Sequence, residues 1–293
     1  MIKKVGAKKI PYVCVAGPVN MAGGQPFSME NLKTIYALTQ KYKIKLWFDA
    51  TRATENAYFI QQKEKGYANK SVAQILKEIC TYFDGIWVSA KKDLLVNIGG
   101  FLATRNKRVF DEAKNMVVIY EGLHSYGGLT GRDMEAMARG IEEMVRPENI
   151  SMRVKQVEYC GIELEKYGIP IVKPSGGHAI FLDAKRFLPH LKQDLFPAQS
   201  LAAEIYIDSG VRGMERGLVS SGRDPVTGEH RYPKLELVRL TFPRRVYTQS
   251  HIDVMVESIA DVYDKRKNIK GLEMVYEPKY LRFFQAKFKK VGK

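Results

Sequence analysis

The sequence predicts an α/β fold followed by a second unit of the α+β class. Through the first half, short apolar runs typical of strands alternate with amphipathic runs typical of helices. A long helical stretch is then broken at Arg146-Pro147, because the residue before a proline avoids the helical conformation. After the break come two strands, a helix, a strand and a final helix. We therefore predict two domains, 1–146 and 147–293.

In the first domain, Ser28 is a good N-cap for a helix over 29–42. Ser71 and Gln74 form a capping box at the start of the amphipathic run 72–82. Between and after these helices, apolar runs of strand length predict buried strands. The predicted strands are 11–15, 44–48, 85–89 and 97–103.

The helical stretch from Asp133 to about Tyr167 crosses the predicted domain boundary, which lies at the break inside it. A turn at Gly176-Gly177 separates two short apolar runs. The predicted strands are 169–172, 179–182 and 235–241, and the predicted helices are 198–208 and 251–268.

The composition is that of a globular protein long enough to bury a substantial core, with 293 residues of which 45% are hydrophobic. No apolar run reaches bilayer length, so no membrane partner is expected. The first residues lack the apolar core of a signal peptide. Cys14, Cys80 and Cys160 are widely spaced, which predicts reduced, buried thiols in a cytoplasmic protein.

A net charge of +15 is the one unusual bulk property. Its functional interpretation is a surface for nucleic acid or another anion. The basic residues are scattered in short clusters, however, and no nucleic-acid motif accompanies them, so they are more typical of solvated faces. Nucleic acid is therefore not the expected partner. A second interpretation is that an acidic part of the protein, outside this sequence, balances the charge.

Two predicted strands end in polar residues, where open α/β sheets carry their functional side chains. One ends at Asp49, followed by Thr51 and Arg52; the other ends at Ser89, followed by Lys91-Lys92. A lysine that forms a Schiff base must be neutral part of the time, and burial or a neighbouring ammonium lowers the lysine pKa towards that condition. Asp49 is suited to keep a pyridine nitrogen protonated, and Ser89 to donate a hydrogen bond to a phosphate.

Other interpretations of the same residues stay open. A strand ending in aspartate and a Lys-Lys pair are both common without any function. Ser89-x-x-Lys92 also has the spacing of a serine nucleophile with a lysine base, but that site expects Ser-Asp-Asn and Lys-Thr-Gly tripeptides, which this sequence lacks. The histidines show no metal-ligand spacing, and His178 is best interpreted as a structural turn residue.

A series of motifs in unbroken order resembles the β-eliminating lyases, the family of the tyrosine phenol-lyases and tryptophanases. The motifs are Asn20-Met-Ala-Gly-Gly-Gln-Pro26, Phe48-Asp-Ala-Thr-Arg52, Glu55-Asn-Ala-Tyr-Phe-Ile60, Ser89-Ala-Lys-Lys-Asp93, Asn97-Ile-Gly-Gly-Phe101, Tyr126-Gly-Gly-Leu129, Phe196-Pro-Ala-Gln-Ser200, Leu240-Thr-Phe-Pro243 and Tyr276-Glu-Pro-Lys279. The resemblance implies fold type I of the pyridoxal-phosphate-dependent transferases (aspartate aminotransferase-like). Residues 1–146 would then be the C-terminal part of an incomplete cofactor-binding large domain, and 147–293 an α+β small domain.

The resemblance also implies roles for single residues around pyridoxal phosphate. Lys92 would be the Schiff-base lysine and the base that removes the substrate's α-proton, and Asp49 would pair with the pyridine nitrogen. Asn20 and Arg52 would lie by the ring's phenolic oxygen, and Ser89 would contribute to phosphate binding. The family binds a monovalent cation such as potassium, and Asn97 falls where a backbone oxygen reaches it.

Substrate residues follow in the same way. Arg239 resembles the arginine that holds the substrate carboxylate, a role that suits its bidentate guanidinium. Arg216, Phe283 and Phe284 match the phenol-lyase branch, and a guanidinium can bond a phenolic oxygen where indole offers no acceptor. The implied reaction is β-elimination of L-tyrosine to phenol, pyruvate and ammonia, with a tryptophanase-type reaction as the alternative.

Family members have a further N-terminal segment that carries the phosphate cup, the aromatic residue stacked on the cofactor, a proton-donating tyrosine and most of the cation site. This chain alone is therefore expected to have weak or no activity unless a complementing N-terminal fragment supplies that part. The alternatives are a non-catalytic truncated remnant and a basic binding module. The family's homotetramers, with shared active sites, imply a homo-oligomer here.

Overall fold

The structure, a computed structural model, describes residues 2–292. Its contacts group these residues into two compact units. Unit 1 comprises residues 2–18 and Pro26–Met152, and unit 2 comprises Val19–Gln25 and residues 153–292. This grouping divides the chain six residues after the predicted boundary (152 − 146 = 6), and it assigns the short segment Val19–Gln25 to unit 2. As domains, 1–146 and 147–293 remain a prediction.

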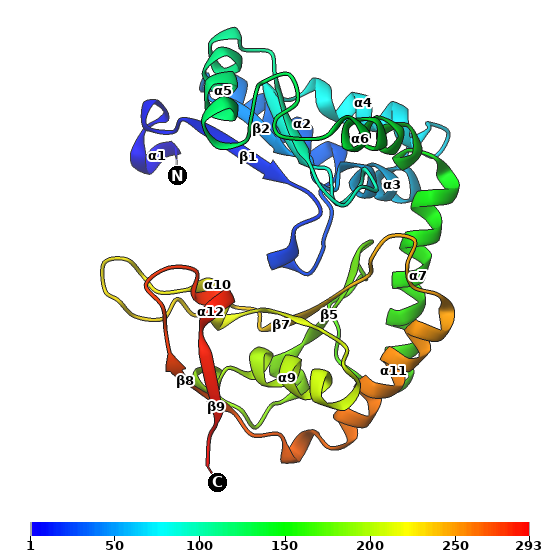
Figure 1. The fold of residues 1–293 in the computed structure, drawn as a ribbon, viewed down its shortest axis with the longest axis vertical. Helices are drawn as coiled ribbons and strands as arrows, with labels where there is room; N and C mark the ends of the chain where they lie inside the picture. Colours follow the sequence, from blue (N-terminus) through cyan, green and yellow to red (C-terminus); the bar gives the residue numbers. More distant parts are fainter. Residues whose placement is uncertain (1, 293) are drawn as a thin grey trace. The chain divides into compact units, whose positions relative to one another are not determined.

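Unit 1 is built on a sheet whose described strands have the order β1-β2-β3-β4 (Figure 1). β1 (Tyr12–Ala16), β2 (Lys45–Asp49) and β3 (Gly85–Ser89) are parallel, and β4 (Gly100–Thr104) is antiparallel to β3. Parallel strands need crossover connections, which the intervening helices provide. The carboxyl ends of β1, β2 and β3 therefore lie at one edge of the sheet.

One face of this sheet is covered by helices. Leu46 and Phe48 point into the core from β2, and Phe48 stacks on Phe83 with ring centroids 4.7 Å apart. Two predicted caps are confirmed: Ser28 accepts from Asn31 N, and Ser71 forms the capping box with Gln74. The covering helices are α2 (Met29–Lys41), α3 (Ala53–Lys63) and α4 (Val72–Thr81).

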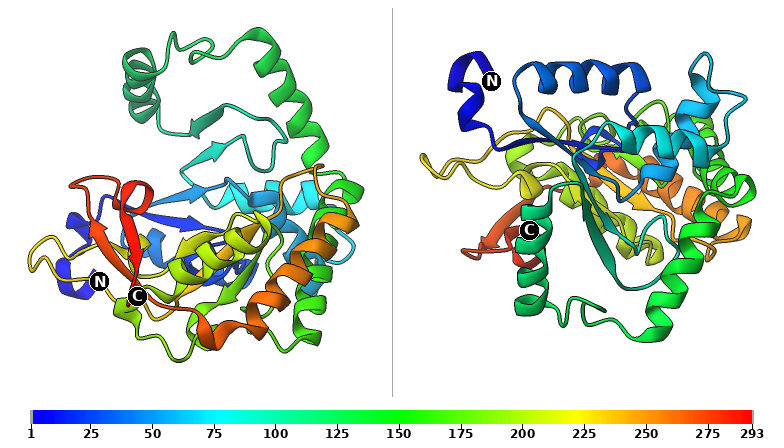
Figure 2. Two further views of the ribbon diagram at one scale, coloured as in Figure 1. Left: turned by 60° about the horizontal axis from the view of Figure 1, so that its bottom comes forward. Right: turned by 90° about the horizontal axis from the view of Figure 1, so that it is seen from above.

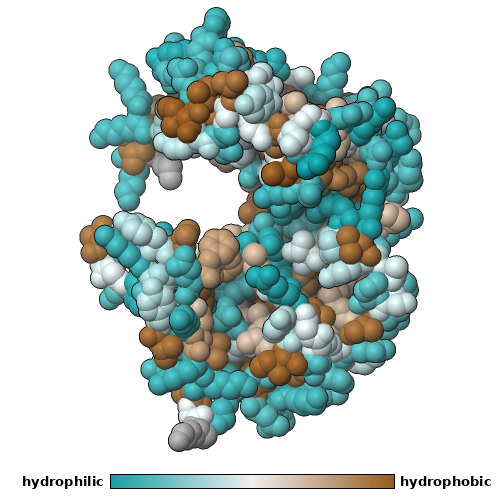
Figure 3. Space-filling view, viewed as in Figure 1, coloured by the Kyte–Doolittle hydropathy of each residue, from teal (hydrophilic) through white to brown (hydrophobic). Residues whose placement is uncertain are grey.

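At the β4 end of the sheet the chain is much less covered. β4 is mostly exposed, and α5 (Lys107–Tyr120) has no buried residue in the described chain. Figure 2 shows α5 apart from α2, α3 and α4, and Figure 3 shows apolar side chains gathered over it. α6 (Gly131–Met144) and α7 (Pro147–Lys166) follow, so the break predicted at Arg146-Pro147 is confirmed.

Unit 2 contains an antiparallel sheet with the described order β5-β7-β6, made of β5 (Ala179–Asp183), β7 (Leu237–Thr241) and β6 (Met214–Arg216). α9 (Pro197–Ser209) packs on β6 and β7, and α11 (Gln249–Asp264) packs on α9. The second half of α7 completes this core. Its largest cluster joins one face of the sheet to these helices through Ile180, Leu182, Val238, Leu240, Leu201 and Ile259.

Shorter elements connect these layers. They are α1 (Ile2–Val5), η1 (Ala7–Lys9), η2 (Asn20–Ala22), α8 (Ala184–Phe187), η3 (Gln193–Leu195), α10 (Leu218–Ser221), η4 (Arg266–Asn268), β8 (Leu272–Tyr276), α12 (Arg282–Gln285) and β9 (Lys287–Lys290). β8 and β9 pair antiparallel. Among the described helices, none has the length and apolar character needed to cross a membrane.

Three local predictions are wrong. The segment 169–172 is not a strand but makes one isolated bridge, Ile171 to Leu182, because Pro170 has no N–H to donate. The strand predicted over 97–103 begins at Gly100, since Gly99 turns the chain with a φ of 101°. Cys14 is exposed rather than buried, whereas Cys160 is buried as predicted.

Candidate functional site

In unit 1, Asp49 and Ser89 lie on the sheet face opposite the buried Leu46 and Phe48. Side chains alternate between faces along a strand, and the register pairs Asp49 with Trp87, two residues before Ser89. The same face carries Trp47 stacked on Trp87, with ring centroids 5.9 Å apart. On this face, a stacked pair of tryptophans therefore precedes a carboxylate and a hydroxyl at the carboxyl ends of neighbouring parallel strands.

A chain of hydrogen bonds links Asp49 to the turn that holds Lys92. Asp49 Oδ1 accepts from the backbone N–H of Thr51 at 3.2 Å. Thr51 Oγ1 in turn accepts from the N–H of Ser89 at 3.2 Å. The N–H of Lys92 donates to the Ser89 carbonyl at 3.3 Å. The three predicted residues Asp49, Ser89 and Lys92 are thus brought together, with Thr51 as the connecting residue that the motif analysis assigned no role.

The two adjacent lysines differ in how far they are buried. Lys92 is half-buried, whereas Lys91 is exposed. Arg52, which follows Thr51, is buried at 8% exposure. Asp93, directly after Lys92, is buried at 2% exposure and accepts from the N–H of Thr54. The sequence did not single out Asp93, because its partner is 39 residues away.

These residues fit the chemistry of pyridoxal phosphate. A carboxylate suits a protonated pyridine nitrogen, hydroxyl and cationic groups suit a phosphate and a phenolic oxygen, and a half-buried amine suits an aldehyde. Asn97 is exposed in the segment before β4, and its potassium contact stays a prediction. In residues 2–292, no three His, Cys, Asp or Glu side chains are grouped as metal ligands.

In unit 2, two of the predicted substrate residues, Arg239 and Arg216, lie on one face of the β5-β7-β6 sheet. Arg239 of β7 is paired with Phe181 of β5 on one side and with Met214 of β6 on the other. Arg216 lies two residues after Met214 on β6, on the same face, and is paired with Leu237 of β7. The Nη2 atoms of Arg239 and Arg216 contact the Met214 sulfur at 2.9 and 3.0 Å. Met214 therefore lies between the two arginines, a position that the motifs did not reveal.

Phe283 joins this group from α12. The Arg216 guanidinium lies over its ring, 5.0 Å from the centroid, as in a cation–π contact. Phe284 packs edge-on against Phe283 but is 73% exposed. Of the four residues predicted to bind substrate, Arg239, Arg216 and Phe283 are thus joined by direct contacts, and Phe284 lies at their margin.

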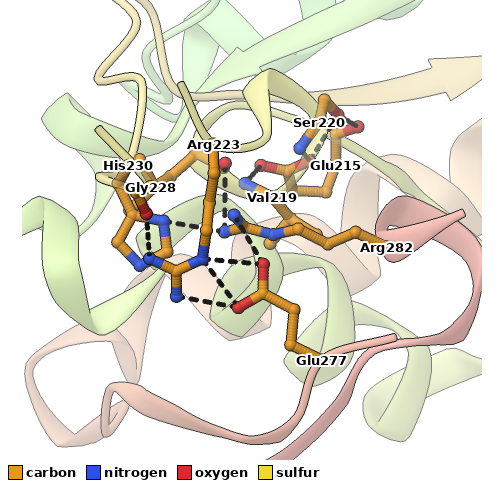
Figure 4. A network of polar contacts seen from close by, with 9 residues as sticks. Glu215, Val219, Ser220, Arg223, Gly228, His230, Glu277 and Arg282 are labelled. Carbon is orange, nitrogen blue, oxygen red and sulfur yellow. Dashed lines mark hydrogen bonds and ion pairs between the residues drawn. The ribbon is translucent and has the colours of Figure 1, made fainter. Parts of the chain in front are cut away.

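A network of charges holds α12 in place, as Figure 4 shows. Glu277 bonds Arg223, with a shortest distance of 2.7 Å, and Arg282 at 3.2 Å. Arg282 Nη2 also donates to His230 Nδ1 at 3.0 Å. Burial and the nearby Arg282 lower the pKa of His230, which keeps Nδ1 available as an acceptor. This network fixes the helix that presents Phe283.

The contacts of Asn20 group it with unit 2, whereas Asp49 is a residue of unit 1. Its Oδ1 atom lies 2.9 Å from Nε2 of His178, a residue with no exposed surface. The His178 ring also packs edge-on against Phe181 of the sheet. His178 is therefore an ordered residue behind Asn20, which agrees with its interpretation as a structural residue of the Gly-Gly-His turn.

Two buried carboxyl groups underlie Arg216. Glu215 accepts from the N–H groups of Val219 and Ser220, each at 3.0 Å, and from the Ser220 hydroxyl. Glu236 has no exposed surface and accepts from Gln193 at 2.7 Å. Burial, with the charge of Glu215 adding to it, raises the pKa of Glu236 to about 7. An acidic residue inside an apolar strand-like run is a signal that could have revealed Glu236.

Glu236 predicts a pH-dependent stability. Its folded pKa of about 7 lies above its ordinary 4.5, so the folded state retains a proton that the unfolded state releases. The free energy of unfolding should therefore fall as pH rises from about 4.5 to 7, by up to about 3 kcal/mol. In Glu236→Gln, the part of this decrease in the free energy of unfolding that comes from Glu236 should be absent. Urea unfolding at pH 5, 6, 7 and 8 measures it. The exposed Glu229→Gln is the control; a Glu236→Gln profile identical to that of the parent would contradict the assignment.

The model of the family described as "Beta-eliminating lyase" matches residues 1–258. A tyrosine phenol-lyase of Nostoc punctiforme is 61% identical over 288 residues, which are 98% of this chain and 62% of that protein. A tyrosine phenol-lyase of Symbiobacterium sp. is 59% identical over 292 residues, covering 100% of this chain and 64% of its own length. The chain thus spans somewhat less than two thirds of these relatives.

Among solved structures, a serine palmitoyltransferase of Sphingomonas wittichii superposes with a TM-score of 0.58 at 14% identity. The match covers 92% of this chain and 58% of that one. At this identity the likeness concerns the fold alone. It confirms the predicted architecture, fold type I of the pyridoxal-phosphate-dependent enzymes.

Proposed function

The chain belongs to the β-eliminating lyase family, and we propose that it provides the cofactor lysine and the substrate-binding residues of a lyase that converts L-tyrosine to phenol, pyruvate and ammonia. The observation that supports this best is the hydrogen-bonded series from Asp49 through Thr51 and Ser89 to Lys92. It links the groups that pyridoxal phosphate requires within one unit.

Bound pyridoxal phosphate would supply an electron sink for the pair released from the substrate's α-carbon. Lys92 would hold the cofactor covalently, and its Nζ atom would accept the α-proton. Asp49 would keep the pyridine nitrogen protonated, and Ser89 would donate to the phosphate. Arg52 would lie by the ring's phenolic oxygen, where its burial strengthens the electrostatic attraction.

The residues of unit 2 would select the substrate. Arg239 would bind the α-carboxylate through its two parallel N–H groups. Arg216, held over Phe283, would donate to the phenol hydroxyl, and Phe283 and Phe284 would offer apolar surface to the ring. Asn20, ordered by His178, would contact the phenolic oxygen of the cofactor. Indole has no oxygen for Arg216 to bond, so tyrosine is favoured over tryptophan.

Assembly is part of the proposal. Because the chain spans 62–64% of the length of the two relatives, we propose that full activity requires the portion of their length that it does not match. That portion would supply the phosphate cup and most of a potassium site to which Asn97 adds a backbone oxygen. The assembled lyase would be a homo-oligomer, and specifically the homotetramer that the family resemblance implies.

Product analysis tests the reaction. The chain is assayed alone and mixed with the non-matching N-terminal part of the Nostoc relative, with L-tyrosine or L-tryptophan as substrate. The proposal expects phenol from tyrosine in the mixture and little phenol from the chain alone. Indole from tryptophan without phenol would indicate the tryptophanase-type reaction. A mixture that binds the cofactor but releases neither product would indicate a non-catalytic remnant.

Arg216→Ala tests the basis of selectivity. Loss of a charge-assisted hydrogen bond to the phenolic oxygen should lower kcat/KM for tyrosine by roughly 10- to 100-fold. For S-methylcysteine, which has no aromatic ring, the same variant should change kcat/KM little. Arg212→Ala, which removes an exposed arginine just before β6, is the matched control. Equal losses for both substrates would contradict a contact between Arg216 and the phenol.

A further inference from the structure

The turn that carries Lys92 is tightly built. Ala90, Asp93 and Leu94 have at most 2% exposure. The N–H of Ala90 donates to the Gly99 carbonyl at 3.0 Å, so the turn is tied to the start of β4. Lys92 itself is half-buried between these anchors. The position of its amine therefore depends on what holds residues 89–95.

Asp93 ties this turn to a helix that is distant in sequence. α3 begins after Arg52, whose side chain has no acceptor and cannot cap the first N–H groups of the helix. Asp93 Oδ2 instead accepts from the N–H of Thr54, the second residue of α3, at 2.9 Å. A carboxylate at a helix N-terminus is stabilised by both the hydrogen bond and the helix dipole.

This contact joins the two turns of the site in unit 1. The turn from Asp49 to Arg52 leads directly into α3, so the N-terminus of α3 moves with it. Asp93 follows Lys92 in the other turn. A buried, charge-assisted hydrogen bond across 39 residues therefore fixes the Lys92 turn to the Asp49 turn, in addition to the bond between Thr51 and Ser89.

A glycine supports the same turn from α6. Gly140 is the only described residue of α6 that is buried. A Cβ at this position would lie 1.7 Å from the Leu94 carbonyl oxygen and 2.7 Å from its carbon. Because these are backbone atoms, a side chain could be accommodated only if the turn or the helix shifted. The absence of a side chain at Gly140 lets α6 pack directly on the residue after Asp93.

We propose that Asp93 is a positioning residue for Lys92, and that Gly140 keeps the same turn in place from α6. This rests on the proposed function, in which Lys92 carries the cofactor. Asp93 acts through the backbone of the turn and through α3. Its removal should thus impair delivery of the Lys92 amine to pyridoxal phosphate more than it impairs folding.

The matched control is Glu64, which makes the same kind of contact elsewhere in unit 1. Its carboxylate accepts from the N–H of Met29, the first residue of α2, at 2.8 and 3.1 Å. Asp93→Ala and Glu64→Ala each remove a carboxylate from a helix N-terminus, but only the first contact involves the Lys92 turn. The full chain is incubated with pyridoxal phosphate, reduced with borohydride and digested, and the pyridoxyl groups on Lys92 and on its exposed neighbour Lys91 are compared.

The proposal expects the Lys92-to-Lys91 labelling ratio to fall about tenfold or more in Asp93→Ala and to stay near the parent value in Glu64→Ala. Asp93→Asn keeps an acceptor oxygen in a side chain of the same size and should recover most of the ratio. This variant keeps the test valid if Asp93→Ala does not fold. Gly140→Ala should also lower the ratio, whereas Gly131→Ala, where a Cβ meets no atom within 4 Å, should not. Equal ratios in Asp93→Ala and Glu64→Ala would overturn the proposal.

Hydrogen exchange separates this inference from the proposed function. Amides of residues 89–95 should exchange about tenfold faster in Asp93→Ala than in the parent, with no such change in Glu64→Ala. If the parent is not labelled at Lys92 even when it is mixed with the non-matching part of the Nostoc relative, the proposed function fails. Hydrogen exchange would still show whether Asp93 holds the turn. If the parent is labelled and exchange is unchanged in Asp93→Ala, the positioning role is wrong and the function stands.

Discussion

Lys92→Ala is expected to abolish the visible absorbance band of the bound cofactor and to lower phenol release at least about 1,000-fold. The variant removes both the covalent anchor and the base for the α-proton, and a general base alone contributes about 10²- to 10⁴-fold. The measurement is the absorbance spectrum with pyridoxal phosphate, followed by turnover of L-tyrosine in the assembled enzyme.

Lys91→Ala is the matched control for that experiment. Lys91 is adjacent in sequence and has the same charge, but it is exposed where Lys92 is half-buried. The absorbance band should persist in Lys91→Ala. A band that survives in Lys92→Ala and disappears in Lys91→Ala would mean that the wrong lysine of the pair has been assigned.

Arg239→Ala is expected to lower kcat/KM for tyrosine by roughly 100- to 1,000-fold, since loss of one partner of a buried charge pair costs about 2–5 kcal/mol. Arg239 is half-buried in the middle of β7, and its Nη2 atom contacts the sulfur of Met214. A thioether is a weak acceptor, so a carboxylate can replace it as the partner. Steady-state kinetics with tyrosine measure the effect.

Arg239→Lys refines the same test, because it keeps the charge and loses the bidentate geometry. Its kcat/KM should lie between those of the parent and Arg239→Ala. The cofactor band should be intact in both variants, because Lys92 is unchanged. Loss of the band in Arg239→Ala would show that Arg239 supports the fold or the cofactor rather than the substrate.

Much of the fold could be predicted because local signals agree with the tertiary structure. The caps at Ser28 and Ser71 and the apolar run 85–89 define α2, α4 and β3 within a residue. α3 gave no such signal. Its Thr54, Glu55 and Asn56 are all buried, so polar residues occupy core positions and the helical hydrophobic period is lost. α5 was also not predicted, and in this chain it packs few of its apolar residues.

Some residues of the candidate site could likewise be predicted from the sequence, and others could not. Asp49, Ser89 and Lys92 could be proposed from the sequence because strand ends are recognisable, and Arg216, Arg239 and Phe283 because the family motifs include them. Thr51, Asp93 and Met214 act through partners at 38, 39 and 25 residues' distance, which a single sequence does not reveal. Gly140 could not be found either, because its significance lies in one backbone carbonyl of another segment.

The proposed function depends above all on the amine at position 92, which would carry the cofactor. The most direct test is to reduce the assembled, cofactor-loaded protein with borohydride and locate the pyridoxyl group by peptide mass spectrometry. We expect one pyridoxyl group per chain, on the peptide that contains Lys92 and on that side chain. Stoichiometric cofactor attached to any other lysine, or tightly bound cofactor with no covalent link after reduction, would contradict it.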